Sequence, residues 1–174
     1  MDKIISGFLE NLKLGQLQIV KNMGVIPIFC KAGRGPEYLT LKEALDMDLL
    51  TITELDSAGS VPRLKAFNKS KTPVLILDGE ELTGAKQNRV LNASVLLKEE
   101  SETVIPVSCT EQGRWSYKSK KFYDSDIIAA QKVRLCKNFS VNKSLNLDRT
   151  FFSDQGAVWN DTISVQTPDP VQVQ

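Results

Sequence analysis

The sequence predicts a β-rich α+β fold: an antiparallel sandwich or jelly-roll-like open barrel with a few peripheral helices. Short stretches that alternate apolar and polar residues recur about every ten residues, with turn sequences between them, as is typical of strands linked by short loops. Patterns of helical period are short and lie mainly towards the two ends of the chain. Together these patterns indicate a central antiparallel sheet structure flanked by helices.

A chain of 174 residues can bury about two thirds of its unfolded surface around one core. We therefore expect a single globular domain over residues 1–165. Residues 166–174 contain two prolines and show no apolar periodicity, so they are expected to form an extended or disordered tail.

Charge and cysteine content restrict the partners and the compartment. With 22 basic and 21 acidic residues, the chain has no net charge that would attract nucleic acid or an anionic membrane, so neither is an expected partner. No apolar stretch reaches the roughly 18 residues of a membrane span. The cysteines Cys30, Cys109 and Cys136 are odd in number and form no CxxC pair. This argues against a disulfide framework or a zinc site and favours a cytoplasmic location.

The chain contains no histidine. This excludes Ser-His and Cys-His nucleophile pairs, the HExxH zinc site and the usual near-neutral general base. Any catalysis must use carboxylates, Lys, Arg, Tyr, Cys or a Mg²⁺ ion held by carboxylates. No cofactor is required.

The first predicted elements are a helix and a hairpin. Apolar residues at helical spacing predict an amphipathic helix over residues 2–12. Residues 16–21 and 25–31 have the composition of strands, and Asn22-Met-Gly24 between them is typical of a tight turn. These two strands are expected to pair as a hairpin.

A capping box begins the next predicted helix. The Thr40 side chain can accept from the main chain at Glu43, and the Glu43 carboxylate can reach back to the main chain of Thr40. Two alternating stretches follow, residues 49–55 and 63–68, and each predicts a half-buried strand.

Three central strands are predicted over residues 74–77, 90–97 and 103–107. The charged residues 98–101 form the turn between the last two, which makes these strands antiparallel neighbours.

The last part of the chain has a helical pattern. A helix is predicted to begin at Ser125 or Asp126 and to run to Lys137. Another helical segment is predicted over residues 154–161.

A first polar cluster lies between the strands at residues 74–77 and 90–97. Gly79 and Gly84 let the main chain turn sharply and approach a ligand closely. The side chains supply carboxylates, amides and cations; they are Glu80, Glu81, Lys86, Gln87, Asn88 and Arg89. Such a mixture suits a polar ligand with hydroxyls and an anionic group. The alternative is a charged, solvated loop, which the residue types alone favour somewhat.

A second polar cluster follows the strand at residues 103–107. It combines a carboxylate, an amide, a guanidinium and an aromatic ring: Glu111, Gln112, Arg114 and Trp115. Because Arg89 precedes one of two antiparallel neighbours and Cys109 follows the other, the two clusters are expected to meet at one rim of the sheet. Trp115 could then stack on a base or sugar, and the arginines could pair with phosphate.

Two of these residues also have structural interpretations. Trp115 could be an ordinary core or rim aromatic, which is the commoner role for a tryptophan. Cys109 could be a nucleophile activated by Lys86 or Arg114, but without histidine a buried, inert thiol is the favoured interpretation.

A third polar group begins with Ser153, which can cap a helix, and Asp154, which complements the helix dipole. A helix start is the simplest interpretation. Gln155 and Trp159 could nonetheless complete the wall of a pocket.

Three strings in these regions carry a resemblance to a known family. They are Leu77-Asp-Gly-Glu-Glu-Leu-Thr-Gly-Ala-Lys-Gln-Asn-Arg89-Val-Leu-Asn92, Ile105-Pro-Val-Ser-Cys109-Thr-Glu-Gln-Gly-Arg-Trp115 and Ser153-Asp-Gln-Gly-Ala-Val-Trp159. Tyr38-Leu-Thr-Leu-Lys-Glu-Ala44 and Gly59-Ser-Val-Pro62 also fit. Over roughly residues 14–160 the chain resembles the prokaryotic ARG-and-rhodanese-phosphatase-superfamily-associated protein family, named for its association with ADP-ribosylglycohydrolases and rhodanese-phosphatases.

The resemblance implies a role in prokaryotic conflict or defence systems tied to ADP-ribose or nucleotide metabolism. It carries no catalytic residues over to this chain. Family members usually continue in helical sequence where this chain has Thr167-Pro-Asp-Pro170, so the resemblance does not extend to an activity that needs that region.

The favoured hypothesis is a domain that binds a polar small molecule of nucleotide-like or ADP-ribose-like type. Phosphates are expected at the cations, ribose hydroxyls or base edges at the carboxylates and amides, and a ring on Trp115. The expected ligand-binding residues are Lys86, Gln87, Asn88, Arg89, Gln112, Arg114 and Trp115, with Glu81 and Glu111.

Two other hypotheses stay open. A hydrolase or transferase would use Glu81 and Glu111 as paired carboxylates that divide acid and base roles or hold Mg²⁺. A protein-interaction module would use the polar clusters as a structural network and expose Phe139, Phe151 and Phe152 to a partner. The sequence does not predict an oligomeric state.

Overall fold

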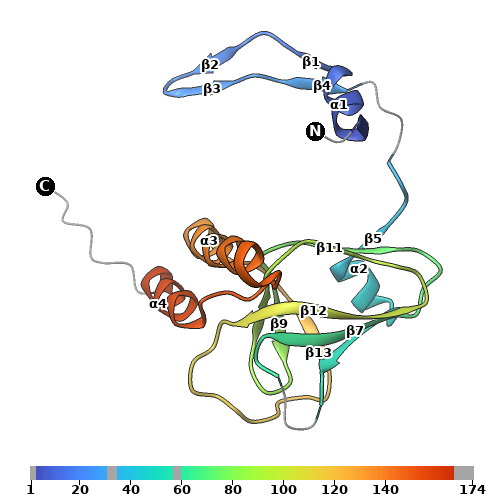
Figure 1. Ribbon diagram of the computed structural model, residues 1–174, viewed down its shortest axis with the longest axis vertical. Helices are drawn as coiled ribbons and strands as arrows, with labels where there is room; N and C mark the ends of the chain where they lie inside the picture. Colours follow the sequence, from blue (N-terminus) through green and yellow to red (C-terminus); the bar gives the residue numbers. More distant parts are fainter. Residues whose placement is uncertain (1–2, 31–34, 57–59, 167–174) are drawn as a thin grey trace, which may run out of the picture. The chain divides into compact units, whose positions relative to one another are not determined.

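The computed structural model describes residues 3–30, 35–56 and 60–166. The chain divides into two compact units, Met1–Glu37 and Tyr38–Gln174 (Figure 1). The single globular domain expected over residues 1–165 stays a prediction. Of the expected tail, Gln166 is the last residue of a helix, and residues 167–174 lie outside the described residues.

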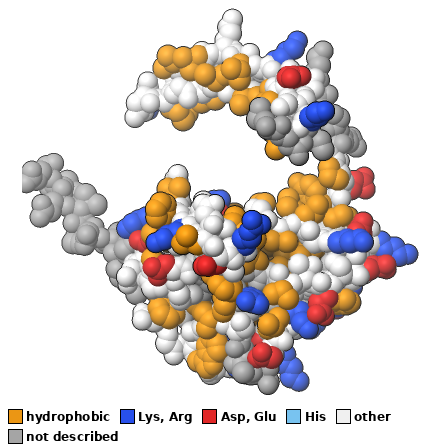
Figure 2. Space-filling view, viewed as in Figure 1, with side chains coloured by type: hydrophobic (Ala, Val, Ile, Leu, Met, Phe, Trp, Pro, Cys, Tyr) orange, Lys and Arg blue, Asp and Glu red, His pale blue; other side chains and the backbone are white. Residues whose placement is uncertain are grey.

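The first unit is a helix followed by short strands. Helix α1 (Lys3–Glu10) confirms the predicted N-terminal helix. The strands pair antiparallel, β1 with β4 and β2 with β3; they are β1 (Leu12–Leu14), β2 (Gln18–Val20), β3 (Met23–Val25) and β4 (Ile28–Cys30). Apolar side chains of these strands are largely exposed on the unit (Figure 2).

The predicted hairpin is confirmed, but its turn lies earlier than expected. Val20 pairs with Met23, so the turn is Lys21-Asn22 and not Asn22-Met-Gly24. Lys21 has a left-handed main chain with φ of 54°, as the two-residue turns of hairpins require. Gly24 lies within β3 instead.

The second unit is built on a six-stranded antiparallel sheet in the order β13-β9-β10-β12-β7-β6. Its strands are β6 (Leu50–Glu54), β7 (Arg63–Asn68), β9 (Glu80–Gly84), β10 (Arg89–Leu91), β12 (Ser101–Cys109) and β13 (Phe122–Ile128). The outer strands β13 and β6 lie close to each other, so the sheet curls into half a barrel (Figure 1). The predicted β-rich α+β class is confirmed.

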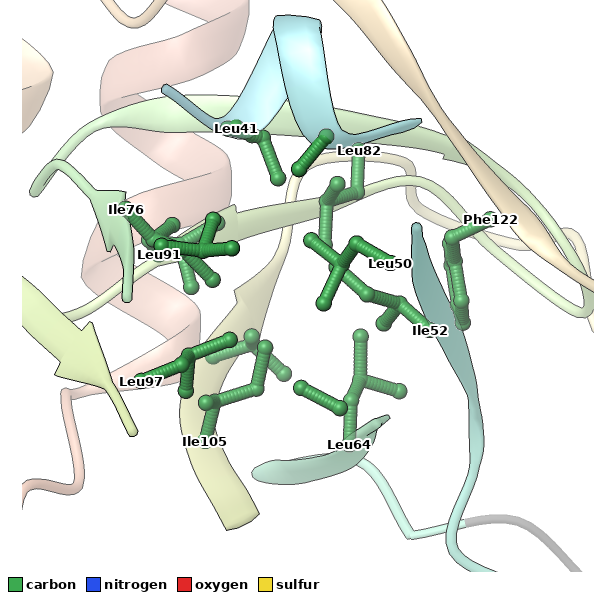
Figure 3. Packing of buried hydrophobic residues seen from close by; sticks show 14 of the residues in the cluster. Leu41, Leu50, Ile52, Leu64, Ile76, Leu82, Leu91, Leu97, Ile105 and Phe122 are labelled. Atoms are coloured by element: carbon green, nitrogen blue, oxygen red, sulfur yellow. The ribbon is translucent and has the colours of Figure 1, made fainter. Parts of the chain in front are cut away.

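A three-stranded sheet and helix α2 (Leu41–Asp46) complete the core. The strands are β5 (Leu39–Thr40), β8 (Val74–Ile76) and β11 (Val95–Leu97). Side chains from both sheets and from α2 pack together (Figure 3); they include Leu41, Leu50, Ile52, Leu64, Ile76, Leu82, Leu91, Leu97, Ile105 and Phe122. The capping box at Thr40 and Glu43 is confirmed, since each side chain accepts from the other residue's main-chain N–H.

Strand β6 follows the predicted alternation and carries a charge inward. Leu50, Ile52 and Glu54 are buried, whereas Thr51 and Thr53 are half-buried. Because alternate side chains share one face of a strand, the period that buries two apolar residues also takes the Glu54 carboxylate into the interior.

The prediction of one continuous strand over residues 90–97 is wrong. The chain forms β10 in the large sheet and continues as β11 in the small sheet. Asn92 lies where the chain leaves β10: its side chain donates to the Phe151 carbonyl at 3.0 Å and accepts from the Ser108 hydroxyl at 2.7 Å. These long-range hydrogen bonds lie at the point where a largely apolar segment is divided between two sheets.

The helix predicted from Ser125 or Asp126 to Lys137 is also wrong at its start. Residues up to Ile128 belong to β13, which has an irregular register between Asp124 and Ile128. The Asp124 and Ser125 side chains accept from main-chain N–H groups two residues ahead. Ser125, one of the two residues expected to cap a helix, therefore lies with Asp124 in an irregular part of a strand instead.

Two helices follow β13. Helix α3 (Gln131–Asp148) is longer than predicted, and α4 (Gln155–Gln166) confirms the helical segment predicted over residues 154–161. In the described part of the chain, none of the helices combines the length and the apolar character needed to cross a membrane.

Candidate functional site

The two polar clusters meet at one end of the large sheet. Strands β10 and β12 pair with Arg89 opposite Cys109, and β9 pairs with β10 with Glu81 opposite Val90. The chain continues from β12 to Thr110, whose hydroxyl donates to Glu81 Oε1 at 2.6 Å. The predicted meeting of the clusters is confirmed, and a direct hydrogen bond joins them.

Arg89 lies in the interior, with 0% of the residue exposed. Its Nη1 donates to Gln87 Oε1 at 3.0 Å and to Cys109 Sγ at 2.8 Å, and its Nη2 lies 3.7 Å from Glu54 Oε1. The guanidinium thus compensates a buried carboxylate and binds side chains of the protein. A contact between Arg89 and a ligand phosphate would require this cluster to open.

The surroundings of Cys109 support its interpretation as a structural thiol. The residue is fully buried, and its Sγ donates to Gln87 Oε1 at 3.0 Å. Burial raises the pKa of the thiol, against the opposing effect of Arg89. A buried, protonated thiol is a poor nucleophile.

Aromatic rings cover the second cation of the first cluster. Lys86 is buried, and its Nζ lies 5.1 Å from the centroid of the Trp115 ring and 5.2 Å from that of Tyr117. Trp115 also lies over the Arg89 guanidinium, 5.7 Å from Cζ to the ring centroid. These are cation–π distances. Trp115 therefore contacts the protein's own cations, while 46% of the residue stays exposed.

Arg114 and Glu111 form a bidentate ion pair. Arg114 Nε donates to Glu111 Oε1 at 2.7 Å, and Nη2 lies 2.7 Å from Oε2. Arg114 Nη1 also donates to the main-chain carbonyls of Ala85 and Ser116, both at 3.0 Å. Hydrogen bonding from Arg114 lowers the pKa of Glu111. The pair holds the segment after β12 against the turn after β9 and keeps Glu111 ionised.

Two adjoining cavities lie beside this ion pair, and we call them together the groove. The polar half, of about 450 Å³, is lined by Asn88, Glu111, Gln112 and Trp159. The apolar half, of about 290 Å³, is lined by Ile127, Ile128, Ala129, Ala130 and Val133. Glu81, Thr110 and Thr162 line both halves. The combined size is typical of small-molecule sites.

Several groove residues have hydrogen-bonding capacity left for a ligand, Glu81 and Asn88 among them. Among the described residues, Glu81 takes part in no ion pair, and its carboxylate accepts from the neutral Thr110 hydroxyl. Asn88 Oδ1 accepts from Thr83 and from Arg114, each at 3.2 Å. Its amide nitrogen donates in none of the hydrogen bonds between described residues, so it can serve a ligand.

The space beside the glycines of the first cluster is occupied by other residues of the chain. Gly84 has φ of 117°, and a methyl group there would lie 2.6 Å from Ser119 Oγ and 2.8 Å from the Lys121 carbonyl oxygen. A methyl group at Gly79 would lie 2.7 Å from the Arg134 side chain. The close approach expected for a ligand is taken up at both positions by other parts of the chain.

The ARG and Rhodanese-Phosphatase-superfamily-associated Protein domain, ARPP-1, matches residues 11–169. The chain belongs to the ARPP-1 family. The match confirms the resemblance found over roughly residues 14–160 and takes in both halves of the groove. Comparisons with curated proteins and with solved structures gave no match.

Helix α4 of this ARPP-1 domain forms one wall of the groove. Trp159 and Thr162 of α4 line it, and Gln155 binds the main chain of Cys109 through two hydrogen bonds of 2.8 Å. Ser153, just before the helix, lies within hydrogen-bond distance of Ser108. Of the two residues expected at a pocket wall, Trp159 lines the groove, and Gln155 attaches α4 to the main chain of β12.

The ARPP-1 domain contains a second buried ionic cluster, which is not among the predicted site residues. Lys137 of α3 is 0% exposed, its ammonium pairs with the Asp78 carboxylate, and it donates to Asn138 Oδ1 at 2.8 Å. Burial lowers the pKa of Lys137, against the opposing effect of Asp78. The signal in the sequence is the spacing of Val133, Lys137 and Val141, which places the lysine on the buried face of the helix.

The phenylalanines proposed for a protein partner lie in different settings. Phe139 and Phe151 are exposed, whereas Phe152 lies under the Arg63 guanidinium, 5.2 Å from Cζ to the ring centroid. A contact of these residues with a partner stays a prediction.

The donor set beside the groove does not suit a magnesium ion. Over residues 3–30, 35–56 and 60–166, no group of three or more cysteines and carboxylates is arranged to hold a metal. Glu111 is committed to Arg114, which leaves Glu81 as the carboxylate free of an ion pair in the groove lining. One carboxylate is a small part of the six oxygen ligands that Mg²⁺ prefers.

Proposed function

We propose that this ARPP-1 domain binds a polar small molecule of nucleotide-like or ADP-ribose-like type in the groove. The observation that carries the proposal is the joining of a polar and an apolar cavity at Glu81. A nucleotide-like ligand has the same division, because its base has apolar faces and its ribose carries hydroxyls. Carboxylate and amide groups are suitable partners for hydroxyls and for base edges.

The predicted binding residues fall into two groups. Asn88, Gln112, Glu81 and Glu111 line the groove and are assigned to the ligand. The cations and Trp115 are assigned to the wall behind it, where Lys86 and Arg89 are buried and Arg114 holds Glu111 in place. We extend the proposal to a cytoplasmic role in a prokaryotic conflict or defence system, as the family resemblance implies.

An enzyme is the second candidate function. The observation in its favour is that Glu81 and Glu111 line one cavity in different environments, since Glu111 is held ionised by Arg114 and Glu81 contacts a neutral hydroxyl. Carboxylates in unequal environments can divide acid and base roles. A hydrolase or transferase of this kind would consume the ligand.

Calorimetric titration of the full chain tests both candidates. The ligands are NAD, ADP-ribose, cyclic nucleotides and sugar phosphates, with and without Mg²⁺, and mass spectrometry identifies the recovered compound. Ala130→Leu fills part of the apolar half, and Ala130→Ser is its control of similar size. We expect a ligand that is recovered unchanged and binds at least roughly tenfold more weakly to Ala130→Leu than to Ala130→Ser.

Two results would decide against this proposal. Conversion of the ligand would favour the enzyme. Absence of binding across the whole set of compounds, with the fold confirmed by circular dichroism, would overturn both candidates.

A further inference from the structure

The charge of the groove lining is negative. None of the described residues that line either half is Lys or Arg. Of its two carboxylates, Glu111 is neutralised by the bidentate pair with Arg114, whereas Glu81 has a hydroxyl as its partner. The uncompensated charge therefore lies at Glu81, where the two halves of the groove meet.

The hydrogen-bonding groups around this charge include both an acceptor and a donor. Glu81 is an acceptor, and the hydrogen bond from Thr110 at 2.6 Å holds one of its oxygens in place. Asn88 lines the same half of the groove and has an unused amide nitrogen as a donor. A sugar hydroxyl or a base edge can both donate and accept, whereas an ionised phosphate accepts only.

We propose that the groove binds the nucleoside end of its ligand and leaves any phosphate outside. The group bound at Glu81 is a hydrogen-bond donor, neutral or positively charged, on a ring compound whose apolar part contacts Ile128 and Val133 in the apolar half. A phosphate at the same place would lose its hydration and face the Glu81 carboxylate, which is unfavourable at low dielectric. This inference rests on the proposed function, because it names the part of the ligand that the same groove selects.

Calorimetry with the four common ribonucleosides, their 2′- and 3′-deoxy forms and their 5′-monophosphates tests the inference on the full chain. Glu81→Gln keeps the size of the side chain and removes its charge. Glu102→Gln removes an exposed carboxylate that lies outside the groove lining and pairs with Lys65, and it serves as the control. Circular dichroism confirms that each variant is folded, and ADP-ribose is titrated alongside.

We expect at least one ribonucleoside to bind as tightly as its 5′-monophosphate or more tightly. Glu81→Gln should weaken that nucleoside roughly tenfold and should weaken the monophosphate less, because the variant also removes the repulsion. Glu102→Gln should change neither affinity. Loss of affinity in one deoxy form would identify the hydroxyl that donates to Glu81.

The outcomes separate this inference from the function on which it rests. If monophosphates or ADP-ribose bind and no nucleoside does, or if Glu81→Gln leaves the nucleoside affinity unchanged, the inference is overturned while the binding function stands. If no compound binds to the folded chain, the binding function fails and the inference fails with it.

Discussion

Gln155 binds both main-chain groups of Cys109: its Oε1 accepts from the Cys109 N–H and its Nε2 donates to the Cys109 carbonyl, each at 2.8 Å. Strand β7, the neighbour of β12, ends its pairing at Arg63 opposite Pro106. The amide side chain therefore satisfies main-chain groups at a point where β7 no longer pairs with β12. It also fixes the start of α4, and through α4 the groove wall that contains Trp159.

Gln155→Ala removes both of these hydrogen bonds. We expect the free energy of unfolding to fall by about 1–3 kcal/mol, because two buried main-chain groups lose their partners. Urea unfolding measures this, and faster hydrogen exchange in α4 would show that the helix has loosened. Asn160→Ala on the same helix is the control, since Asn160 is exposed. Equal effects of the two substitutions would contradict the assigned role of Gln155.

Arg89→Ala leaves the Glu54 carboxylate buried without its cation. We expect a loss of about 3–5 kcal/mol in unfolding free energy, as is usual when one partner of a buried ion pair is removed. Replacing both residues by methionine should recover much of that loss. Arg63→Ala, an exposed arginine, is the control. A stable Arg89→Ala protein would show that the Glu54 pair contributes little to the fold.

Asp78→Ala and Lys137→Met should differ although they remove partners of one ion pair. Asp78→Ala leaves the fully buried Lys137 ammonium without its carboxylate and should lower the free energy of unfolding by about 3–5 kcal/mol. Lys137→Met should cost clearly less, because the Asp78 side chain keeps the hydrogen bond from Asn138 at 2.9 Å and an ion pair with Arg134. Urea unfolding of the two variants gives the comparison. A larger loss of unfolding free energy in Lys137→Met than in Asp78→Ala would contradict this prediction and would indicate that the unpaired Asp78 carboxylate is the more costly of the two charges.

The Glu111 pair predicts a dependence of stability on pH. The folded-state pKa of Glu111 is lowered by Arg114, so its stabilisation is complete above the unfolded value of about 4.3 and is lost as pH falls through the folded value. Glu111→Gln should be less stable than the native chain at neutral pH, with a difference that shrinks on acidification. Unfolding curves at several pH values test this. A difference independent of pH would exclude the carboxylate charge as its source.

Of the three cysteines, Cys109 should react most slowly with iodoacetamide. Cys30 and Cys136 are exposed, whereas Cys109 is buried and burial raises its pKa. Alkylation of Cys109 should therefore be the slowest and should become fast only in urea. Peptide mass spectrometry over time measures each rate. Rapid labelling of Cys109 in the folded chain would contradict this prediction and would favour a role for Cys109 as a nucleophile.

The sequence by itself determined the features that depend on neighbouring residues. The capping box at Thr40, the strand at residues 63–68 and the antiparallel approach of Arg89 to Cys109 could all be predicted, and each is confirmed. Capping and alternation arise from residues close together in the chain, and antiparallel pairing brings the start of one strand to the end of its neighbour. The family could be predicted as well, because its characteristic strings are continuous.

The tertiary structure decided which polar groups are inside and which face a cavity. The sequence suggests a surface cation at Arg89, yet the alternation of strand β6 buries Glu54, and Glu54 provides a partner for Arg89 in the interior. The largely apolar segment at residues 90–97 is divided between two sheets, and Asn92, where the chain leaves β10, forms long-range hydrogen bonds. Glu81 keeps an uncompensated charge because Arg114 pairs with Glu111 instead. Burial and charge pairing depend on residues distant in the chain, and only the folded arrangement brings those residues together.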